Sequence, residues 1–390
     1  MKYEFDGNPV MPKGFTCASR NCGIKEGDDD LALFYSDTKA NAAAVFTQNL
    51  VPGAPIIAGR EIIKKAKLQA VVVNSRVSNV GTGEEGVKRA YRMGVAAAKE
   101  LACESDEVMM SSTGVIAVEL PIEKIESGII GMKADLGSDP LVGARGIMTT
   151  DTYAKAISVT TDDFTLTIVG KGSGMIEPNM ATMLVYAFTD AAISAKDLDA
   201  VLRRGVNKSF NMLSVDTDTS TSDTMVVMAN GRAGKVDMQD FEEVFESSCI
   251  RMTEMLARDG EGATKLLRIE INEAVSEKEA KIYARAMVNS PLIKTMAHGC
   301  DPNIGRMLMA LGKCFDNTLD VDTLTLSVNG TVVFADSVKT EFDEPALRQS
   351  IDSEEVIFKI DLALGSGSAT AYGCDLTHGY VDENAAYYSS

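Results

Sequence analysis

The stretch KGSGMIEPNMATML, Lys171 to Leu184, decides how the middle of this chain is interpreted. Apolar runs typical of β-strands flank it, with FTLTIVG before it and MLVYAFT overlapping its end. Its two glycines and its Pro-Asn pair predict a loop between two strands, because these residues permit sharp turns. A connecting loop is the simplest interpretation. It leaves open why a lone hydroxyl residue, Thr182, stands where the second strand begins.

The composition is that of a globular protein with an acidic surface. The chain has 390 residues, is 45% apolar and carries a net charge of −18. That length predicts two or three structural units, or one large α/β body. The charge argues against nucleic acid and anionic membranes as partners. We find no signal-peptide-like start and no membrane-spanning run, so we expect a cytoplasmic protein without membrane contact.

Cysteine and histidine usage gives no sign of a disulfide framework or a metal centre. The seven cysteines are odd in number and form no CxxC pair, which indicates reduced thiols. Only two histidines are present, His298 and His378, and common zinc sites need clusters of His or Cys. We therefore expect no metal, and we expect both histidines to make structural hydrogen bonds.

Strand and helix patterns alternate along the whole length. The expected strands are 30–37, 42–49 and 68–75, and the expected helices are 87–102, 197–213 and 241–260. In the first helix, Tyr91 and Val95 are expected to face the core with its alanines. Residues 107–121 predict a strand, a loop and a second strand. This mixed order predicts the α/β or α+β class.

Two hairpins are expected near the end of the chain. The segment 324–334 contains Asn-Gly between alternating apolar residues, the strongest short hairpin signal. The segments 355–364 and 368–376 alternate in the same way, and a Gly-Ser turn between them predicts that they pair with each other.

Two motifs resemble ligand loops but depart from them. GTGEEG, at 81–86, matches GxGxxG, yet the strand before it ends well short of the first glycine. It supports only a minor alternative, an uncut nucleotide-binding protein. DTDTSTSDT, at 216–224, begins like a calcium loop but lacks the glycine and the glutamate of later positions. We expect a polar loop whose side chains bond its own backbone.

Two further motifs have both a structural and a chemical interpretation. SSTGV, at 111–115, is either a plain turn or a set of hydroxyl and amide donors for a developing oxyanion. RDGEG, at 258–262, is either a helix stop or a loop that presents Glu261 to a cationic substrate.

Taken together, the motifs resemble the ornithine acetyltransferase (glutamate N-acetyltransferase) family across essentially the whole chain, in matching order. The segments that carry the resemblance are KGSGMIEPNMATML, SSTGVI, IMTTDT, SVDTDTSTSDT, DGEGATK, VVNSPLIKTMAHGCDPNIGR and YVDENAAYYSS. The resemblance implies a layered α/β (α+β) sandwich of mixed sheets and helices, like the self-cleaving fold of ornithine acetyltransferases and DmpA-type proteins. It also implies a role in arginine biosynthesis.

The resemblance gives Thr182 its role. It implies that the protein cuts its own Ala181–Thr182 bond, leaving an α subunit (1–181) and a β subunit (182–390) in an α2β2 heterotetramer. In such cleavage the Thr182 hydroxyl attacks the carbonyl carbon of Ala181, the acyl group shifts from N to O, and water opens the ester. The freed amine of Thr182, with an ordinary pKa of about 7.7–8.0, then serves as the base for its own hydroxyl.

The same resemblance implies ping-pong transfer of an acetyl group from N-acetylornithine to glutamate through acetyl-Thr182. Thr113 and Gly114 match the positions that stabilise the oxyanion. The positions that match substrate contacts are Thr149, Lys171, Thr182, Glu261, Asn384 and Ser389. No cofactor is implied, and acetyl-CoA stays open as a second acetyl donor.

One departure from the family leaves the substrates open. The chain reads NSRVSNVGTG at 74–83, where the family usually has NSGNANACTG, so Arg76 and Val77 replace a glycine and an asparagine. The alternatives are therefore a side-pathway acetyltransferase with an altered substrate, or an amidohydrolase or aminopeptidase on the same scaffold.

Overall fold

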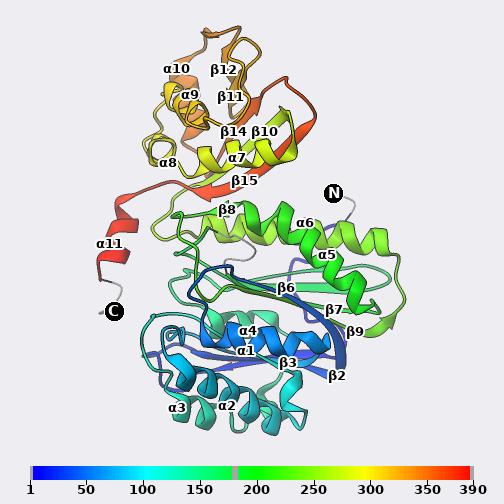
Figure 1. Cartoon of the computed structure of the whole chain (residues 1–390). Helices are drawn as coiled ribbons and strands as arrows, with labels where there is room; N and C mark the ends of the chain where they lie inside the picture. The colour runs from blue at the N-terminus through cyan, green and yellow to red at the C-terminus, as the bar shows by residue number, and fades with distance from the viewer. Residues whose placement is uncertain (1–2, 178–182, 387–390) are drawn as a thin grey trace. The chain divides into compact units, whose positions relative to one another are not determined.

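The computed structural model describes residues 3–177 and 183–386, which form two compact units (Figure 1). Unit 1 comprises residues up to 172, 178–211 and 219–252, and unit 2 comprises 173–177, 212–218 and 253 onward. This division of the fold differs from the covalent segments expected on either side of Ala181–Thr182. Those segments stay a prediction.

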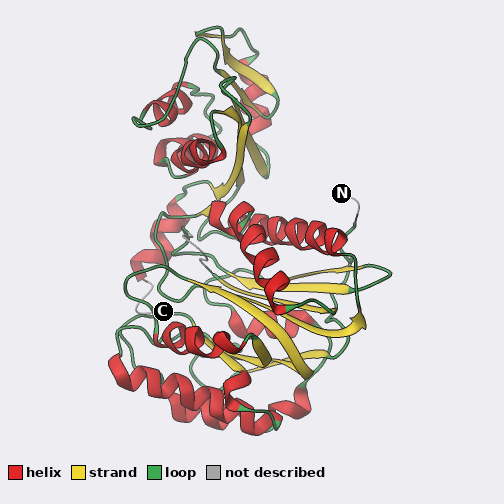
Figure 2. Ribbon diagram, turned by 45° about the vertical axis from the view of Figure 1, so that its right-hand side comes forward, coloured by secondary structure: helices red, strands yellow, loops and turns green. Residues whose placement is uncertain are grey.

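Unit 1 is built on one mixed eight-stranded sheet in the order β4-β3-β2-β9-β7-β6-β5, with β1 paired to β2. Its strands are β1 Phe15–Arg20, β2 Leu31–Phe46, β3 Lys67–Asn74, β4 Val108–Ser112, β5 Lys155–Thr160, β6 Thr165–Lys171, β7 Leu184–Ala191 and β9 Thr224–Gly234. Its helices are α1 Ala54–Ile62, α2 Gly83–Leu101, α3 Ile122–Ile129, α4 Pro140–Ile147, α5 Ala195–Lys208 and most of α6 Met238–Arg258. Figure 2 shows helices packed on both sides of this sheet.

The two runs around the central loop are confirmed as neighbouring strands. β6 and β7 pair antiparallel, and Lys171 lies opposite Leu184. All eight residues of β7 are buried, which explains the continuous apolar run in the sequence. On its other edge β7 pairs parallel with β9, with Leu184 opposite Thr224. The strand that follows Thr182 is therefore a central, rigid element.

Unit 2 contains a second mixed sheet, of seven strands, in the order β13-β12-β11-β14-β10-β15-β8. Its strands are β8 Leu213–Ser214, β10 Leu266–Ala274, β11 Thr325–Val328, β12 Thr331–Ala335, β13 Val338–Lys339, β14 Glu355–Asp361 and β15 Gly367–Cys374. Its helices are α7 Glu277–Val288, α8 Pro291–His298, α9 Gly305–Gly312, α10 Glu344–Ile351 and α11 His378–Ala386. Each unit has an apolar core of its own, so the predicted mixed α/β class is confirmed.

The Asn-Gly hairpin is confirmed, but the second expected hairpin is wrong. Asn329 and Gly330 both have positive φ, 45° and 81°, between the antiparallel strands β11 and β12. In contrast, β14 and β15 do not pair with each other. β10 lies between them, parallel to β14 and antiparallel to β15. The expected strands did not include β10, and without it the two flanking strands looked adjacent.

Two expectations about strand ends are also corrected. The two expected strands, 30–37 and 42–49, form one long strand, β2, which ends at Phe46 and whose pairing with β3 shifts register between Tyr35 and Ala40. The polar residues between Tyr35 and Ala40, which look like a turn in the sequence, therefore lie in an irregular part of one continuous strand. No second strand follows β4 in 107–121, where Val115 makes only an isolated bridge with Val77.

Helix α2 begins earlier than expected and turns a different face to the core. Met93 and Ala97 are fully buried, whereas Tyr91 and Val95 are 42% and 53% exposed, so the predicted inward position of these two residues is wrong. Gly94 lets the Met110 side chain approach the helix closely, which selects the buried face. No helix in the described parts of the chain is long and apolar enough to cross a membrane.

Candidate active site

The turn after β4 holds the two residues expected to stabilise an oxyanion. The N–H of Thr113 donates to the carbonyl of Asn74 (3.1 Å), and the N–H of Val115 donates to the carbonyl of Arg76 (2.9 Å). Gly114 lies between them with φ +124°, and a Cβ there would come 2.1 Å from the carbonyl carbon of Arg76. Only glycine fits this position.

This geometry leaves two donors unused. Within residues 3–177 and 183–386, no group accepts the N–H of Gly114 or bonds the hydroxyl of Thr113. Thr113 is 6% exposed, so its hydroxyl lies in a largely water-excluded environment, and Gly114 beside it is partly buried. Preorganised donors of this kind suit the negative charge that develops on an attacked carbonyl oxygen.

Lys171 and Thr149 lie together, as expected of two residues that contact one substrate. The ammonium of Lys171 donates to the hydroxyl of Thr149 (3.3 Å). One carboxylate fixes the backbone at both places. Asp151 accepts the N–H of Thr149 (3.0 Å) and the N–H of Gly172, which follows Lys171 (2.9 Å). Asp151 also forms an ion pair with Lys155 (2.8 Å), and both side chains are fully buried.

Lys171 affects the pKa values of two buried carboxyl groups, those of Asp151 and Asp223. Burial opposes ionisation of Asp151, but the charges of Lys155 and Lys171 hold the pKa of its carboxyl below the usual value. Burial raises the pKa of Asp223 well above its usual value, and Lys171 only partly offsets this. The sequence alone did not indicate a role for Asp151, Lys155 or Asp223. The only signal was the spacing of Asp151 and Lys155, four residues apart.

Asp151→Asn should lower the free energy of unfolding by about 3–5 kcal/mol, because it breaks the fully buried ion pair with Lys155. Asp199→Asn is the matched control, since Asp199 pairs with Arg203 at the same i,i+4 spacing but at the surface. That control should cost less than about 1 kcal/mol. Urea denaturation of both variants gives the comparison. Equal, small losses would show that the buried pair contributes little.

In unit 2, Glu261 and Asn384 lie together. The amide of Asn384 donates to the carboxylate of Glu261 (2.8 Å), which is 6% exposed. The N–H of Glu261 donates to the carbonyl of Ser173 (3.0 Å). A Cβ at Gly174 would come 2.2 Å from the carboxylate, so this glycine of the central loop is needed for close approach.

Helix α11, which carries Asn384, is fixed beside the segment that contains Glu261 and Gly262. The hydroxyl of Thr377 donates to the carbonyl of Gly262 (2.6 Å). Gly262 has φ +65°, and a Cβ there would come 2.3 Å from the backbone nitrogen of Tyr380. The glycines around Glu261 therefore have two functions. They follow the end of α6, and Gly262 lets the backbone of α11 approach closely.

Three expected site residues, Ala181, Thr182 and Ser389, lie outside the described residues. The first described residue after the cleavage position is Met183, which is buried and accepts the N–H of Thr224 (2.9 Å). Across the two described ranges, no group of three or more His, Cys, Asp or Glu side chains is arranged to hold a metal. All seven cysteines are free, and His298 bonds Asp375 at 3.1 Å.

The two motifs that resemble ligand loops have structural functions. Asp216 accepts the backbone N–H of Met175 (2.6 Å) and Ile176 (2.8 Å), as expected of a polar loop. The GTGEEG motif forms the start of α2, whose first turn contains Glu84 and Glu85. These carboxylates would repel a phosphate at the helix N-terminus, so the geometry does not favour the nucleotide-binding alternative.

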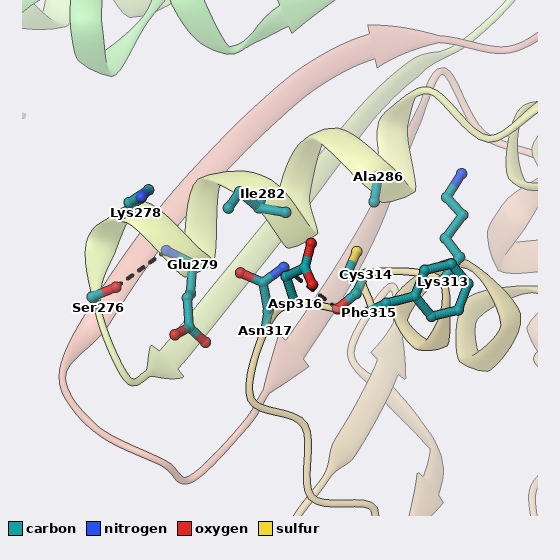
Figure 3. Close-up of a pocket in the computed structure, with 10 residues that line it drawn as sticks. All are labelled: Ser276, Lys278, Glu279, Ile282, Ala286, Lys313, Cys314, Phe315, Asp316 and Asn317. Atoms are coloured by element: carbon teal, nitrogen blue, oxygen red, sulfur yellow. Dashed lines mark hydrogen bonds between the residues drawn. The ribbon is translucent and has the colours of Figure 1, made fainter.

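A separate cavity in unit 2 contains none of the expected site residues. Figure 3 shows it between α7 and the turn 313–317. Its polar groups stabilise local structure, since Ser276 caps α7 through the N–H of Glu279 (3.2 Å). The carboxylate of Glu279 in turn accepts the N–H of Thr318 (3.0 Å).

Comparison with known proteins identifies the family. Residues 16–389 match the profile of the ArgJ family. The chain is 43% identical to Arginine biosynthesis bifunctional protein ArgJ 2 of Clostridium acetobutylicum, over 97% of this chain and 98% of the relative. It is 39% identical to Glutamate N-acetyltransferase Oat2 of Streptomyces clavuligerus, over 98% of this chain and 99% of the relative.

One solved structure is also similar to part of the chain. The crystal structure of Arginine biosynthesis bifunctional protein argJ from Bacillus halodurans is 34% identical, with a TM-score of 0.49. That match covers 51% of this chain and 96% of the solved chain. The full-length matches place this protein in the acyltransferase class of arginine-biosynthesis enzymes. The chain belongs to the ArgJ family.

Proposed function

We propose that this protein transfers an acetyl group from N-acetylornithine to glutamate through an acetyl ester on Thr182. Relatives that match nearly the full length are named as arginine-biosynthesis bifunctional proteins and as a glutamate N-acetyltransferase, and this observation carries the proposal. The unused donors at Thr113 and Gly114 support it, because acyl transfer needs oxyanion stabilisation.

Self-cleavage at Ala181–Thr182 prepares the nucleophile. The hydroxyl of Thr182 adds to the carbonyl carbon of Ala181, the peptide C–N bond breaks, and an ester forms. Water hydrolyses the ester and leaves residues 1–181 with a carboxylate and Thr182 with a free amine. A free amine beside the hydroxyl supplies the base that an isolated threonine lacks, so no histidine is needed.

Transfer then proceeds in two half-reactions. The amine of Thr182 takes the hydroxyl proton while the oxygen attacks the acetyl carbonyl of the donor. The oxyanion is stabilised by the Gly114 N–H and the Thr113 hydroxyl, and it collapses as the C–N bond breaks. Ornithine leaves with the proton, and acetyl-Thr182 remains. The amine of glutamate attacks that ester, and N-acetylglutamate leaves as the product.

The remaining residues recognise the ends of the substrate. Lys171 pairs with the α-carboxylate, and Thr149 bonds beside it, since these two already lie 3.3 Å apart. Glu261 pairs with the δ-ammonium of ornithine, and Asn384 holds the Glu261 carboxylate in place. Ser389 adds a hydrogen bond to the substrate. The enzyme acts in the cytoplasm as an α2β2 heterotetramer, and its free thiols suit a reducing compartment.

Glu261→Gln should impair N-acetylornithine more than an uncharged acetylated donor of similar length. Removing one partner of a buried ion pair costs about 3–5 kcal/mol, because the other charge stays uncompensated. The uncharged donor carries no such charge, so its kcat/KM should fall much less. Steady-state kinetics with both donors decides. If Glu261 only ends the helix, both donors should lose kcat/KM equally, and the melting temperature should fall.

The reaction itself is tested by incubating the purified protein with N-acetylornithine, with and without glutamate, and separating the products by chromatography. The proposal expects N-acetylglutamate and ornithine in equal amounts. Free acetate instead would identify an amidohydrolase of the same scaffold. Transfer to another amine alone would identify a side-pathway acetyltransferase. Replacing the donor with acetyl-CoA in the same assay tests the second activity that the word bifunctional describes in the relatives.

A further inference from the structure

Cys300 and Lys265 form a contact between two reactive side chains that the proposed acetyl transfer does not use. The sulfur of Cys300 lies 2.9 Å from the ammonium nitrogen of Lys265. Lys265 directly precedes β10 and Cys300 follows the end of α8, so the fold brings together positions 35 residues apart. By comparison, the ammonium of Lys294 lies 3.8 Å from the sulfur of Cys374. Both pairs belong to unit 2, so they can be compared directly.

Lys265 is held in place by several hydrogen bonds. Its N–H donates to the carboxylate of Asp375 (2.9 Å), and its ammonium donates to the carbonyls of Ala297 (3.0 Å) and Ile351 (2.8 Å). Those carbonyls lie in the last turns of α8 and α10, where a cation is favourable. An ammonium has three donors, and the third is directed at the sulfur of Cys300. The lysine therefore stabilises two helix ends and keeps its nitrogen against the sulfur.

Cys300 is the more accessible partner of the pair. It is half-buried, whereas Lys265 is 6% exposed. Its backbone has φ +49°, the left-handed conformation that is common just after a helix end, and its N–H donates to the carbonyl of Ala297 (3.3 Å). Cys374, in contrast, is 1% exposed, and burial raises the pKa of its thiol. A small oxidant in the solvent can thus reach Cys300 but is kept away from Cys374.

We propose that Cys300 and Lys265 are an oxidation site, at which hydrogen peroxide joins the two side chains through one bridging oxygen atom. Two reactive atoms that a fold holds within about 3–3.5 Å react as an intramolecular pair, which removes most of the entropic cost of joining them. A direct sulfur–nitrogen bond would draw the nitrogen away from the carbonyls of Ala297 and Ile351. An inserted oxygen leaves the nitrogen and the sulfur close to their present separation, so the bridge fits this site.

The bridge forms in two oxidation steps. In the first, the sulfur of Cys300 attacks one peroxide oxygen, the O–O bond breaks, and the thiol becomes a sulfenic acid as water leaves. In the second, the ammonium of Lys265 gives one proton to the carboxylate of Asp352, which lies 4.0 Å away. A second peroxide molecule then takes one hydrogen atom from the nitrogen and one from the sulfenic oxygen and leaves as two waters, while the N–O bond forms. The sulfur and the nitrogen are oxidised, and both peroxide molecules are reduced.

The test treats the full protein with hydrogen peroxide, alkylates the remaining thiols after denaturation, and identifies linked peptides by mass spectrometry of a digest. Glutathione in a parallel sample shows that the peroxide is active. Cys300→Ala removes the sulfur, and Lys265→Arg keeps a cation but removes the amine. The pair Lys294 and Cys374 is the matched control within the same digest, because it has the same chemistry at 3.8 Å in a buried place.

In the wild type we expect one linked pair of peptides that joins Lys265 to Cys300. Its mass should be that of the two peptides plus one oxygen atom and less two hydrogen atoms. The linked pair should be absent from both variants, and Lys294 and Cys374 should stay unlinked. In Lys265→Arg, where no amine captures the sulfenic acid, Cys300 should be oxidised further to the sulfinic acid. The wild type, Cys300→Ala and the control pair decide the matter even if Lys265→Arg does not fold.

Three results would overturn the inference. The first is a wild-type Cys300 that gains oxygen atoms without becoming linked to Lys265. The second is a linked pair that lacks the added oxygen, since this would mean a direct sulfur–nitrogen bond. The third is an unmodified Cys300 under conditions that oxidise glutathione completely.

Discussion

Thr182→Ala should leave the chain uncut and without detectable acetyl transfer. The substitution removes the hydroxyl that we propose attacks the Ala181 carbonyl, and it also removes the atom that would carry the acetyl group. Denaturing gel electrophoresis should show one intact band for the variant and two fragments of similar size for the wild type. The acetyl-transfer assay should be at background for the variant.

Thr182→Ser is the matched control, since it keeps a hydroxyl and a future N-terminal amine in the same place. It should still be cut and still transfer acetyl groups, although at altered rates. Efficient cleavage of Thr182→Ala, with a normal second fragment, would mean that another residue is the nucleophile of the cleavage step.

Thr113→Ala should lower kcat by about 10²–10³ while KM changes little, because an oxyanion donor acts mainly in the transition state. The structure makes this specific, since the Thr113 N–H is already used by Asn74 and only the hydroxyl is available. Thr113→Ser, which keeps that hydroxyl, should retain most of the turnover. Self-cleavage of Thr113→Ala should also slow, as both reactions pass through a tetrahedral oxyanion.

Steady-state kinetics and a time course of cleavage measure these effects. An unchanged kcat with a raised KM would assign Thr113 to substrate binding. An unchanged kcat and KM would leave the oxyanion to the backbone N–H of Gly114 alone.

Local signals in the sequence predicted the elements they directly encode. The apolar runs on either side of the central loop are strands β6 and β7, and Asn329-Gly330 turns a hairpin. Pairing over long distances was not predictable in this way. β10 separates β14 from β15 because packing within the sheet, not the turn between two strands, selects their neighbours. Polar residues inside β2 looked like a turn because a shift of register in its pairing with β3 accommodates them within one strand.

The family resemblance supplied residues with direct chemical roles but not those that hold them. Lys171 and Thr149 were expected, and the structure brings them together. Asp151 was not expected, although it bonds the backbone at Thr149 and Gly172. Its function arises only when a loop and the end of a strand meet, which no single segment reveals. The contact between Cys300 and Lys265 likewise becomes visible only when two distant segments meet.

Intact-mass spectrometry of the purified wild-type protein, before and after incubation with N-acetylornithine alone, tests whether Thr182 is freed by cleavage and then carries the acetyl group. We expect two fragments, 1–181 and 182–390, and a mass gain of one acetyl group on the second fragment only. That gain should map to Thr182 and disappear when glutamate is added. A single uncut chain, or an acetyl group carried on any other residue, would contradict this expectation.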